Sequence, residues 1–321
     1  MLCCGIDEAG LGPTLGPMVM SACAFEVPDE HAVERLWDIL ANSVAPAPKR
    51  GETRLVVADS KRLYRGAKRL ATLEETALSL AAAYAGDAVR DVAEFARRLG
   101  IRRLDERISS YPWYRGERSP LPLDADAQAV REKAALLEKD LHRSDVRFRY
   151  LASELLFAGE FNSIIDETGN KAEAGAFLLC ELLRRLARTF EGELFTVYID
   201  RQGGRKYYAE LLARAFEGWW VEPVEEEAGH SHYRLLRRRV TVEAHFLEKA
   251  DARLLPVAAA SIISKYLREA FMERFNAFWK AHSSSLVPTA GYPLDAKRFI
   301  ADIEGLVTAL DVERDALIRK R

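Results

Sequence analysis

Short apolar runs that end in turn residues recur along this chain, and each predicts a buried β-strand. The first run covers residues 1–4 and leads into the polar stretch Asp7-Glu8. The second, residues 18–27, follows a turn rich in glycine and proline, so the two strands are compatible with a hairpin. The same pattern predicts further strands at residues 55–58, 146–150, 195–200 and 240–246.

Other stretches space their apolar residues three and four positions apart, as helices with one buried face do. Residues 67–84, residues 172–186 and the stretch from about Asp295 show this spacing. A long helix is predicted to begin at Pro256, because proline is tolerated in the first turn of a helix. Three alanines, residues 258–260, would let that helix approach the sheet closely. The elements together predict an α/β protein.

The composition is that of an ordinary globular protein, with 49% hydrophobic and 30% charged residues. The length of 321 residues is sufficient for one large domain or for two. A net charge of −2 provides no global basic field. Local patches or bound cations can still attract nucleic acid, so that class of protein is not excluded.

The cysteines Cys3, Cys4, Cys23 and Cys180 lie in apolar segments without the spacing of metal ligands. This pattern indicates free thiols in a reducing compartment. The chain has no apolar run of about 18 residues and no basic-then-apolar leader. We therefore expect a cytoplasmic protein without membrane contact.

Residues 86–145 differ in character and are predicted to form an insertion or small subdomain. They combine paired arginines with the cluster Tyr111-Pro112-Trp113-Tyr114 and a charged helix near residues 124–142. Such a mixture could touch a nucleic-acid strand by stacking and phosphate contact. The interpretation that we favour is a solvated helical face with a local aromatic plug.

An acidic loop is predicted at residues 225–227, just before His230 and His232. Two histidines two positions apart could bind a transition metal, but nothing nearby completes the ligand set. We interpret both as loop residues, and His245 as a residue on a sheet face.

Four carboxylates stand at strand ends or just before a helix, where α/β proteins place functional groups. They are Asp7, Glu8, Asp200 and Asp251. Magnesium and manganese prefer oxygen ligands, and a pair of such ions can hold a phosphodiester and activate water. Gly10 and Gly12 would also let backbone N–H groups approach a phosphate. Phosphoryl-transfer chemistry is one hypothesis, and a strand that ends in a solvated polar turn is the alternative for the first stretch.

An ordered set of motifs extends along nearly the whole chain outside residues 86–145. The set comprises Gly5-Ile6-Asp7-Glu8-Ala9-Gly10 with Gly12-Pro13, Asp59-Ser60-Lys61-Arg62-Leu63, Lys249-Ala250-Asp251, Ala258-Ala259-Ala260-Ser261-Ile262-Ile263-Ser264-Lys265, Arg268-Glu269 and Gly291-Tyr292-Pro293. In type and order these motifs resemble those of ribonuclease HII.

The resemblance implies one RNase H-like domain over residues 1–321, with a mixed central sheet flanked by helices, the helical insertion and C-terminal helices. It implies a monomeric endoribonuclease that hydrolyses the RNA strand of RNA–DNA hybrids, or cuts ribonucleotide-containing duplexes, by a two-metal mechanism. The products would carry 5′-phosphate and 3′-hydroxyl ends. By motif, the catalytic ligands of Mg²⁺ or Mn²⁺ would be Asp7, Glu8, Asp200 and Asp251. The residues in contact with substrate would be Gly10, Leu11, Gly12, Ser60, Lys61 and Tyr292.

The chain departs from the family pattern at Leu11, after Asp200 and in the insertion, which is longer than usual. Leu11 stands where ribonuclease HII usually has an arginine. By the resemblance, loss of that arginine affects the recognition of a single embedded ribonucleotide more than it affects the cleavage chemistry. Arg201-Gln202 follows Asp200 where the family often has Gly-Asn. The sister type, ribonuclease HIII, also lacks the arginine, but its last acid is typically glutamate and here it is Asp251.

Two other functions stay open. One is an RNase H-fold nuclease that cuts structured DNA, with the insertion setting the substrate. The other is a non-catalytic module that binds hybrids, although retained carboxylates without a metal would repel one another. A purely structural protein would explain neither the acids nor the glycines.

Overall fold

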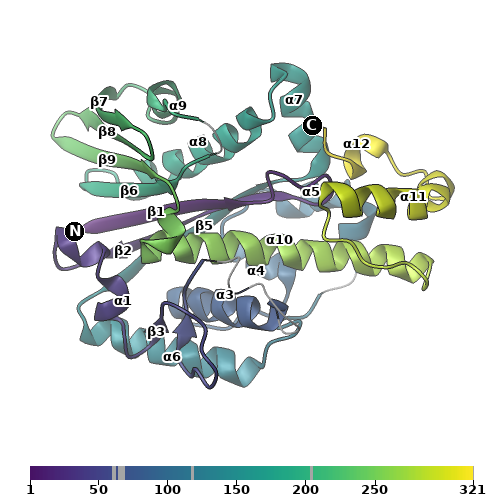
Figure 1. Ribbon diagram of the computed structural model, residues 1–321, viewed down its shortest axis with the longest axis horizontal. Helices are drawn as coiled ribbons and strands as arrows, with labels where there is room; N and C mark the ends of the chain where they lie inside the picture. The colour runs from purple at the N-terminus through teal and green to yellow at the C-terminus, as the bar shows by residue number, and fades with distance from the viewer. Residues whose placement is uncertain (60–62, 64–68, 117–118, 203–204, 321) are drawn as a thin grey trace.

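A mixed β-sheet runs through the middle of the molecule, with helices on both faces (Figure 1). The computed structural model describes residues 1–321 except 60–62, 64–68, 117–118, 203–204 and 321. Its main sheet has seven strands in the order β5-β2-β1-β6-β9-β8-β7. This architecture confirms the predicted α/β class with a mixed central sheet flanked by helices.

The centre of the sheet is built around β1 (Leu2–Ala9). It pairs antiparallel with β2 (Met18–Glu26), so the hairpin is confirmed, and β2 pairs antiparallel with β5 (Arg147–Leu156). On its other side β1 runs parallel to β6 (Phe195–Asp200), which runs parallel to β9 (Val240–Leu247). Because β1 and β6 are parallel, their carboxyl ends lie at the same edge of the sheet.

The outer strands β7 (Trp220–Glu227) and β8 (His230–Arg237) complete the sheet. The interpretation of residues 225–232 as a loop was therefore wrong, because His230 and His232 lie on β8. Edge strands carry charges and proline that mask their pattern, as the glutamates and Pro223 do in β7. The sequence did carry a signal for the next strand, β8, in which every second side chain, including Tyr233 and Leu235, is buried.

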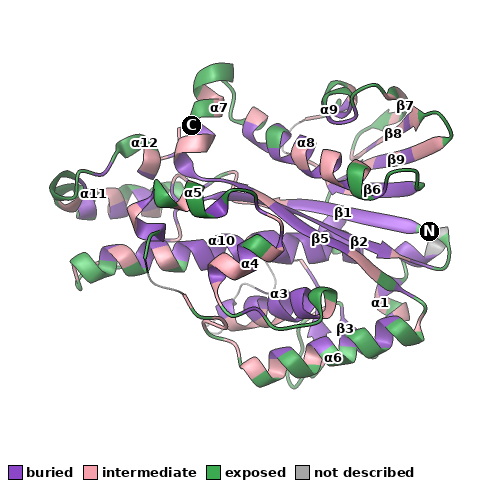
Figure 2. Cartoon of the chain, turned by 180° about the vertical axis from the view of Figure 1, so that it is seen from behind, coloured by how far each residue is buried: buried purple, intermediate pink, exposed green. Residues whose placement is uncertain are grey.

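Helix α10 (Leu255–His282) covers one face of β1 and β2 and is itself mostly buried (Figure 2). On its far side lie α3 (Arg69–Ala85), α4 (Val92–Arg98) and α6 (Ala127–Arg143). Helices α7 (Ala158–Thr168), α8 (Ala172–Thr189) and α9 (Ala209–Ala215) cover the opposite face of the sheet. Among the described residues, no helix is long and apolar enough to cross a membrane.

The chain finishes with α11 (Pro293–Ala309) and α12 (Arg314–Leu317) beside the end of α10 that lies away from the sheet's outer strands (Figure 1). The remaining elements are short: η1 (Glu30–Val33), α1 (Leu36–Ile39), β3 (Val44–Ala45), β4 (Leu55–Val56), α5 (Leu104–Ser109), η2 (Pro112–Tyr114) and η3 (Ala250–Ala252).

The aromatic cluster of residues 111–114 is buried and faces the interior. Tyr111, Trp113 and Tyr114 are each no more than 5% exposed. Trp113 packs against Phe275, and Tyr114 packs against Phe271, both on α10. These side chains are therefore an aromatic plug, as favoured above, and they have no surface for base stacking. The division of the chain into a core and an insertion at 86–145 stays a prediction.

Gly5 marks the closest approach between the sheet and α10. A Cβ atom at this position would lie 2.2 Å from the carbonyl carbon of Pro256 and 2.3 Å from the nitrogen of Val257. Both neighbours are backbone atoms, so no side-chain movement could make room. The close approach expected from the alanine run is therefore confirmed, and it depends on glycine in the strand.

We expect Gly5→Ala to lower the free energy of unfolding by about 3 kcal/mol, since overpacking must force helix and strand apart. Gly305→Ala is the matched control, because Gly305 lies in α11 and a Cβ there would meet nothing within 4 Å. That change should stabilise the protein by up to about 1 kcal/mol through helix propensity. Urea denaturation of both variants measures the difference, and equal effects would contradict the close-approach argument.

Candidate active site at the ends of β1 and β6

Asp7 and Asp200 occupy neighbouring positions at the edge of the sheet. Ile6 of β1 is in register with Ile199 of β6, so the next residue of each strand is an aspartate. Side chains alternate along a strand, which places Asp7 on the same face as Gly5, toward α10. Glu8 follows on the same strand as the next, half-buried residue.

Asp251 is brought to the same edge by the turn that follows β9. The backbone N–H of Ala250 donates a hydrogen bond to Asp200 Oδ1 over 2.7 Å. This contact ties η3 to the end of β6, and Asp251 itself is buried. The side chains of Asp200 and Asp251 therefore belong to one local assembly.

Three of the four sequence-predicted carboxylates act electrostatically on the fourth, Asp7. Burial raises the pKa of Asp7 well above its usual range, and the charges of Glu8, Asp200 and Asp251 raise it further. A hydrogen bond from Ser261 opposes the rise without cancelling it. The structure thus brings the other three acids, Glu8, Asp200 and Asp251, near Asp7.

A divalent cation suits this set of donors in chemical kind. Carboxylate oxygens are the ligands that Mg²⁺ and Mn²⁺ prefer, and a bound cation would remove the repulsion that raises the pKa of Asp7. Over the part of the chain that the structure describes, no group of three or more His, Cys, Asp or Glu side chains has the geometry of a metal site. The fit therefore rests on donor chemistry and charge, and the roles of these residues as ligands stay a prediction.

Serines on α10 fix the helix beneath Asp7. The hydroxyl of Ser264 donates to the carbonyl oxygen of Asp7 over 2.9 Å and lies 2.8 Å from the hydroxyl of Ser21 on β2. Ser21 in turn lies 2.7 Å from Ser153 on β5. This buried chain of hydroxyls links three strands and the helix, so it restrains the backbone that carries the acids.

The glycine loop, defined here as residues 10–12, begins just after the acids. Gly10 has a φ of +92°, and a Cβ there would lie 2.7 Å from the carbonyl oxygen of Pro17 and 2.9 Å from Cδ of Arg268. A side chain at Gly12 would meet nothing within 4 Å. Leu11 is half-buried and packs against the apolar cluster on the α8 side of the sheet. One end of the loop is therefore locked in place while the other is open.

Tyr292 is held near the glycine loop by the backbone of Gly291. The carbonyl oxygen of Gly291 accepts hydrogen bonds from the N–H groups of Thr14 (2.8 Å) and Leu15 (3.2 Å). The ring of Tyr292 is half-exposed, and the charged groups of Lys265 and Arg268 lie 5.9 and 5.6 Å from its centre. Both cations also contact Glu269, at 3.0 and 2.6 Å.

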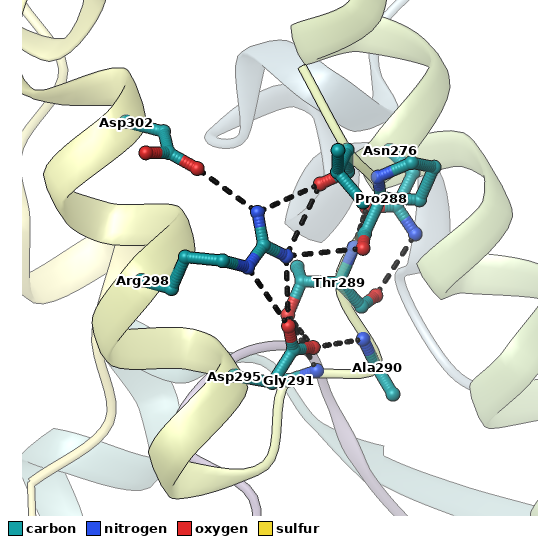
Figure 3. Close-up of polar contacts among 9 residues, drawn as sticks. Asn276, Pro288, Thr289, Ala290, Gly291, Asp295, Arg298 and Asp302 are labelled. Carbon is teal, nitrogen blue, oxygen red and sulfur yellow. Dashed lines mark hydrogen bonds and ion pairs between the residues drawn. The ribbon is translucent and has the colours of Figure 1, made fainter.

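A polar network on α11 shapes the segment before Tyr292 (Figure 3). Asp295 accepts hydrogen bonds from the hydroxyl of Thr289 (2.6 Å) and the N–H of Ala290 (2.8 Å). Arg298 donates to Asp295 over 2.7 Å and also to the carbonyl oxygen of Pro288. Burial alone would raise the pKa of Asp295, but these hydrogen bonds outweigh it, and the pKa is lowered.

Most of the predicted site residues lie at this edge, and two cannot be placed. Ser60 and Lys61 lie outside the described residues. The sequence reasoning assigned no role to Ser264 or Asp295. A signal existed for Ser264, which lies in a quoted motif, whereas the sequence marked Asp295 only as the approximate start of a helix.

No family model matches the sequence, and no curated protein matches it significantly. Among solved structures, the chain is similar to the RNase HII of a PCNA:RNase HII complex from Archaeoglobus fulgidus, with 17% identity and a TM-score of 0.46 over 100% of this chain and 95% of that chain. It is similar to Bst-RNase HIII in complex with Mn²⁺, with 17% identity and a TM-score of 0.48 over 100% of this chain and 66% of that chain. A third is the ribonuclease H2 from Pyrococcus horikoshii OT3, with 18% identity and a TM-score of 0.41 over 99% and 92%. These neighbours agree with the expected resemblance to ribonuclease HII.

Without divalent cations at pH 7, we expect Asp7→Asn to be more stable than the wild type by about 1 kcal/mol or more. The raised pKa means that the folded state holds a proton more tightly, so wild-type stability falls as pH rises above the unfolded pKa of about 4. The advantage of Asn should therefore shrink as pH falls toward 4. Thermal unfolding in chelator measures it, with Asp105→Asn, an exposed site, as the control expected within about 0.5 kcal/mol of wild type.

We expect Asp295→Ala to cost about 1 kcal/mol, because it leaves the Thr289 and Ala290 donors without their acceptor. Since the pKa of Asp295 is lowered, its contribution is present above about pH 4 and is lost as the pH falls further. Asp302→Ala removes the other carboxylate that contacts Arg298 but leaves the loop untouched, so it should have almost no effect. Equal losses in urea denaturation would place the stabilising interaction on Arg298 and not on the loop.

Proposed function

We propose that this protein is a divalent-metal-dependent endonuclease that hydrolyses the RNA strand of RNA–DNA hybrids, leaving 5′-phosphate and 3′-hydroxyl ends. The observation that carries the proposal is the gathering of Glu8, Asp200 and Asp251 around a buried Asp7. Such an assembly is unfavourable for a metal-free structural role, because each charge disfavours the others. It is favourable for a site that takes up cations.

The residues divide into groups by what they can do. Asp7, Glu8, Asp200 and Asp251 would hold two Mg²⁺ or Mn²⁺ ions. Bound ions of this kind supply Lewis-acid stabilisation of phosphate oxygens and a means to activate water. The open end of the glycine loop would bind a phosphate oxygen through backbone N–H groups.

Tyr292 would provide the contact with the sugar. Its half-exposed ring is fixed through Gly291 to the segment that continues the glycine loop. A protein distinguishes RNA from DNA by the 2′-hydroxyl, which requires close contact at one ribose. Cleavage in the cytoplasm by a monomer is part of the same proposal.

We expect the wild type to cut an end-labelled continuous hybrid in Mg²⁺ or Mn²⁺ and to leave all-DNA duplexes, flaps and junctions intact. Asp7→Asn should lower the cleavage rate at least about 100-fold, because it removes a carboxylate that would hold the cations that stabilise the developing charge. Asp105→Asn, which changes the same type of side chain at an exposed position, should cut like the wild type.

Other outcomes would favour the competing functions. Cleavage of flaps or junctions made only of DNA would identify a structure-specific DNA nuclease. Binding of the hybrid by wild type without any cleavage would identify a binding module. A duplex with one embedded ribonucleotide tests Leu11, because its cleavage would show that the loop needs no arginine between the glycines.

A further inference from the structure

Arg319 supports the glycine loop from behind. Its Nη1 donates a hydrogen bond to the carbonyl oxygen of Gly10, and its Nη2 donates to that of Leu11 over 3.1 Å. The backbone N–H of Arg319 also donates to the carbonyl oxygen of Thr14 over 2.9 Å. One residue therefore contacts three positions of the segment that follows the acids.

The guanidinium of Arg319 is buried without a carboxylate partner among the described residues. The residue is 2% exposed, and its charged group lies 3.9 Å from the centre of the Phe161 ring. Burial, and then the charge of Arg268, lower its pKa to about 9. Arginine is seldom buried unless it is paired with an anion. Burial of this cation therefore carries a desolvation free energy that a nearby anion would offset.

The geometry of the peptide bond determines what these hydrogen bonds do. In a trans peptide the N–H points opposite to the C=O of the same unit. Because Arg319 holds the carbonyl oxygens of Gly10 and Leu11, the N–H groups of Leu11 and Gly12 point away from it. No acceptor in the described part of the chain binds either N–H group, and Gly12 faces open space.

We propose that Arg319 is a positioning residue that orients and polarises the two peptide units of the glycine loop, so that the N–H groups of Leu11 and Gly12 bind a phosphate of the substrate backbone. This inference rests on the proposed function. A cation at the carbonyl end of a peptide strengthens the N–H at the other end, since hydrogen-bonded dipoles in series polarise one another. Arg319 thus strengthens the hydrogen bonds from the loop N–H groups to the phosphate without contacting the substrate itself.

The arrangement predicts which property of the substrate is recognised. Phosphates are common to every nucleic-acid strand, whereas the 2′-hydroxyl distinguishes RNA. Loss of Arg319 should therefore weaken the binding of a continuous hybrid and the binding of any other duplex that the protein cuts by the same factor. It should not change the preference between them.

The test is steady-state cleavage of the hybrid by Arg319→Gln, Arg319→Lys, Lys320→Gln and Phe161→Leu. We expect Arg319→Gln to raise KM about tenfold with kcat changed less than about threefold, and Arg319→Lys to recover most of that loss. Lys320→Gln removes the same charge from the next residue, which pairs with Asp166 at the surface, and should leave KM unchanged. Phe161→Leu loosens the packing around Arg319 but keeps the cation, so it should lower the unfolding temperature and leave KM within about twofold.

The results distinguish failure of the role proposed for Arg319 from failure of the proposed nuclease function. If the wild type cuts and Arg319→Gln has an unchanged KM, the role of Arg319 is refuted and the nuclease stands. A rise in KM for Phe161→Leu equal to that for Arg319→Gln would also refute it, because packing alone would explain both. If the wild type binds without cutting, the proposed function fails, and the same variants are compared by Kd with the same tenfold expectation. If the wild type neither binds nor cuts the hybrid, both inferences fail together.

Discussion

The close contact between α10 and β1 at Gly5 is the constraint on which the candidate site depends. Helix and strand run in the same direction, and the α10 residues that meet β1 lie on one face: Val257 at Gly5, Ser264 at Asp7 and Arg268 at Gly10. From Val257 to Arg268 the helix rises about 16 Å, and from Gly5 to Gly10 a strand extends about 16 Å. The two elements therefore stay matched from the core to the glycine loop.

The acids and the cations near them are carried by different elements. The acids stand at the ends of strands, held by backbone contacts such as that of Ala250 with Asp200. Lys265 and Arg268 come from the next turns of α10 and contact Glu269. Glu269, a carboxylate on the helix, thus contacts both cations beside Tyr292. At the strand ends, burial and then the charges of Glu8, Asp200 and Asp251 raise the pKa of Asp7.

The sequence predicted the parts of the fold that depend on local pattern. The β1–β2 hairpin, the strand ending at Asp200 and the helix beginning near Pro256 were all visible as apolar periodicity with turn residues. Strand β7 was not, because an edge strand needs few inward apolar residues and carries glutamates instead. The four acids could be named from their places at strand ends, but their grouping around Asp7 depends on the register of β1 and β6, which no local pattern specifies.

Arg319 shows the limit of sequence reasoning more sharply. Nothing about an arginine next to Lys320 distinguishes it from a solvated charge, and only the folded chain places it against Gly10. The same is true of Asp295, whose partners Thr289 and Ala290 are near in sequence but are brought to it by a turn. The contact of Arg319 arises from tertiary structure and that of Asp295 from the conformation of a turn, and the identity of the single residue predicts neither.

The pairing of Gly10 with a residue 309 positions later has a consequence for how the protein is made. During synthesis β1 can pair with β2 at once, but its other edge waits for β6, and its face waits for α10. The loop after the acids receives its last support only when Arg319 has left the ribosome. The acids are therefore translated well before the residue that supports the loop beside them, so a nascent chain carries them through the synthesis of residues 11–318 without that support.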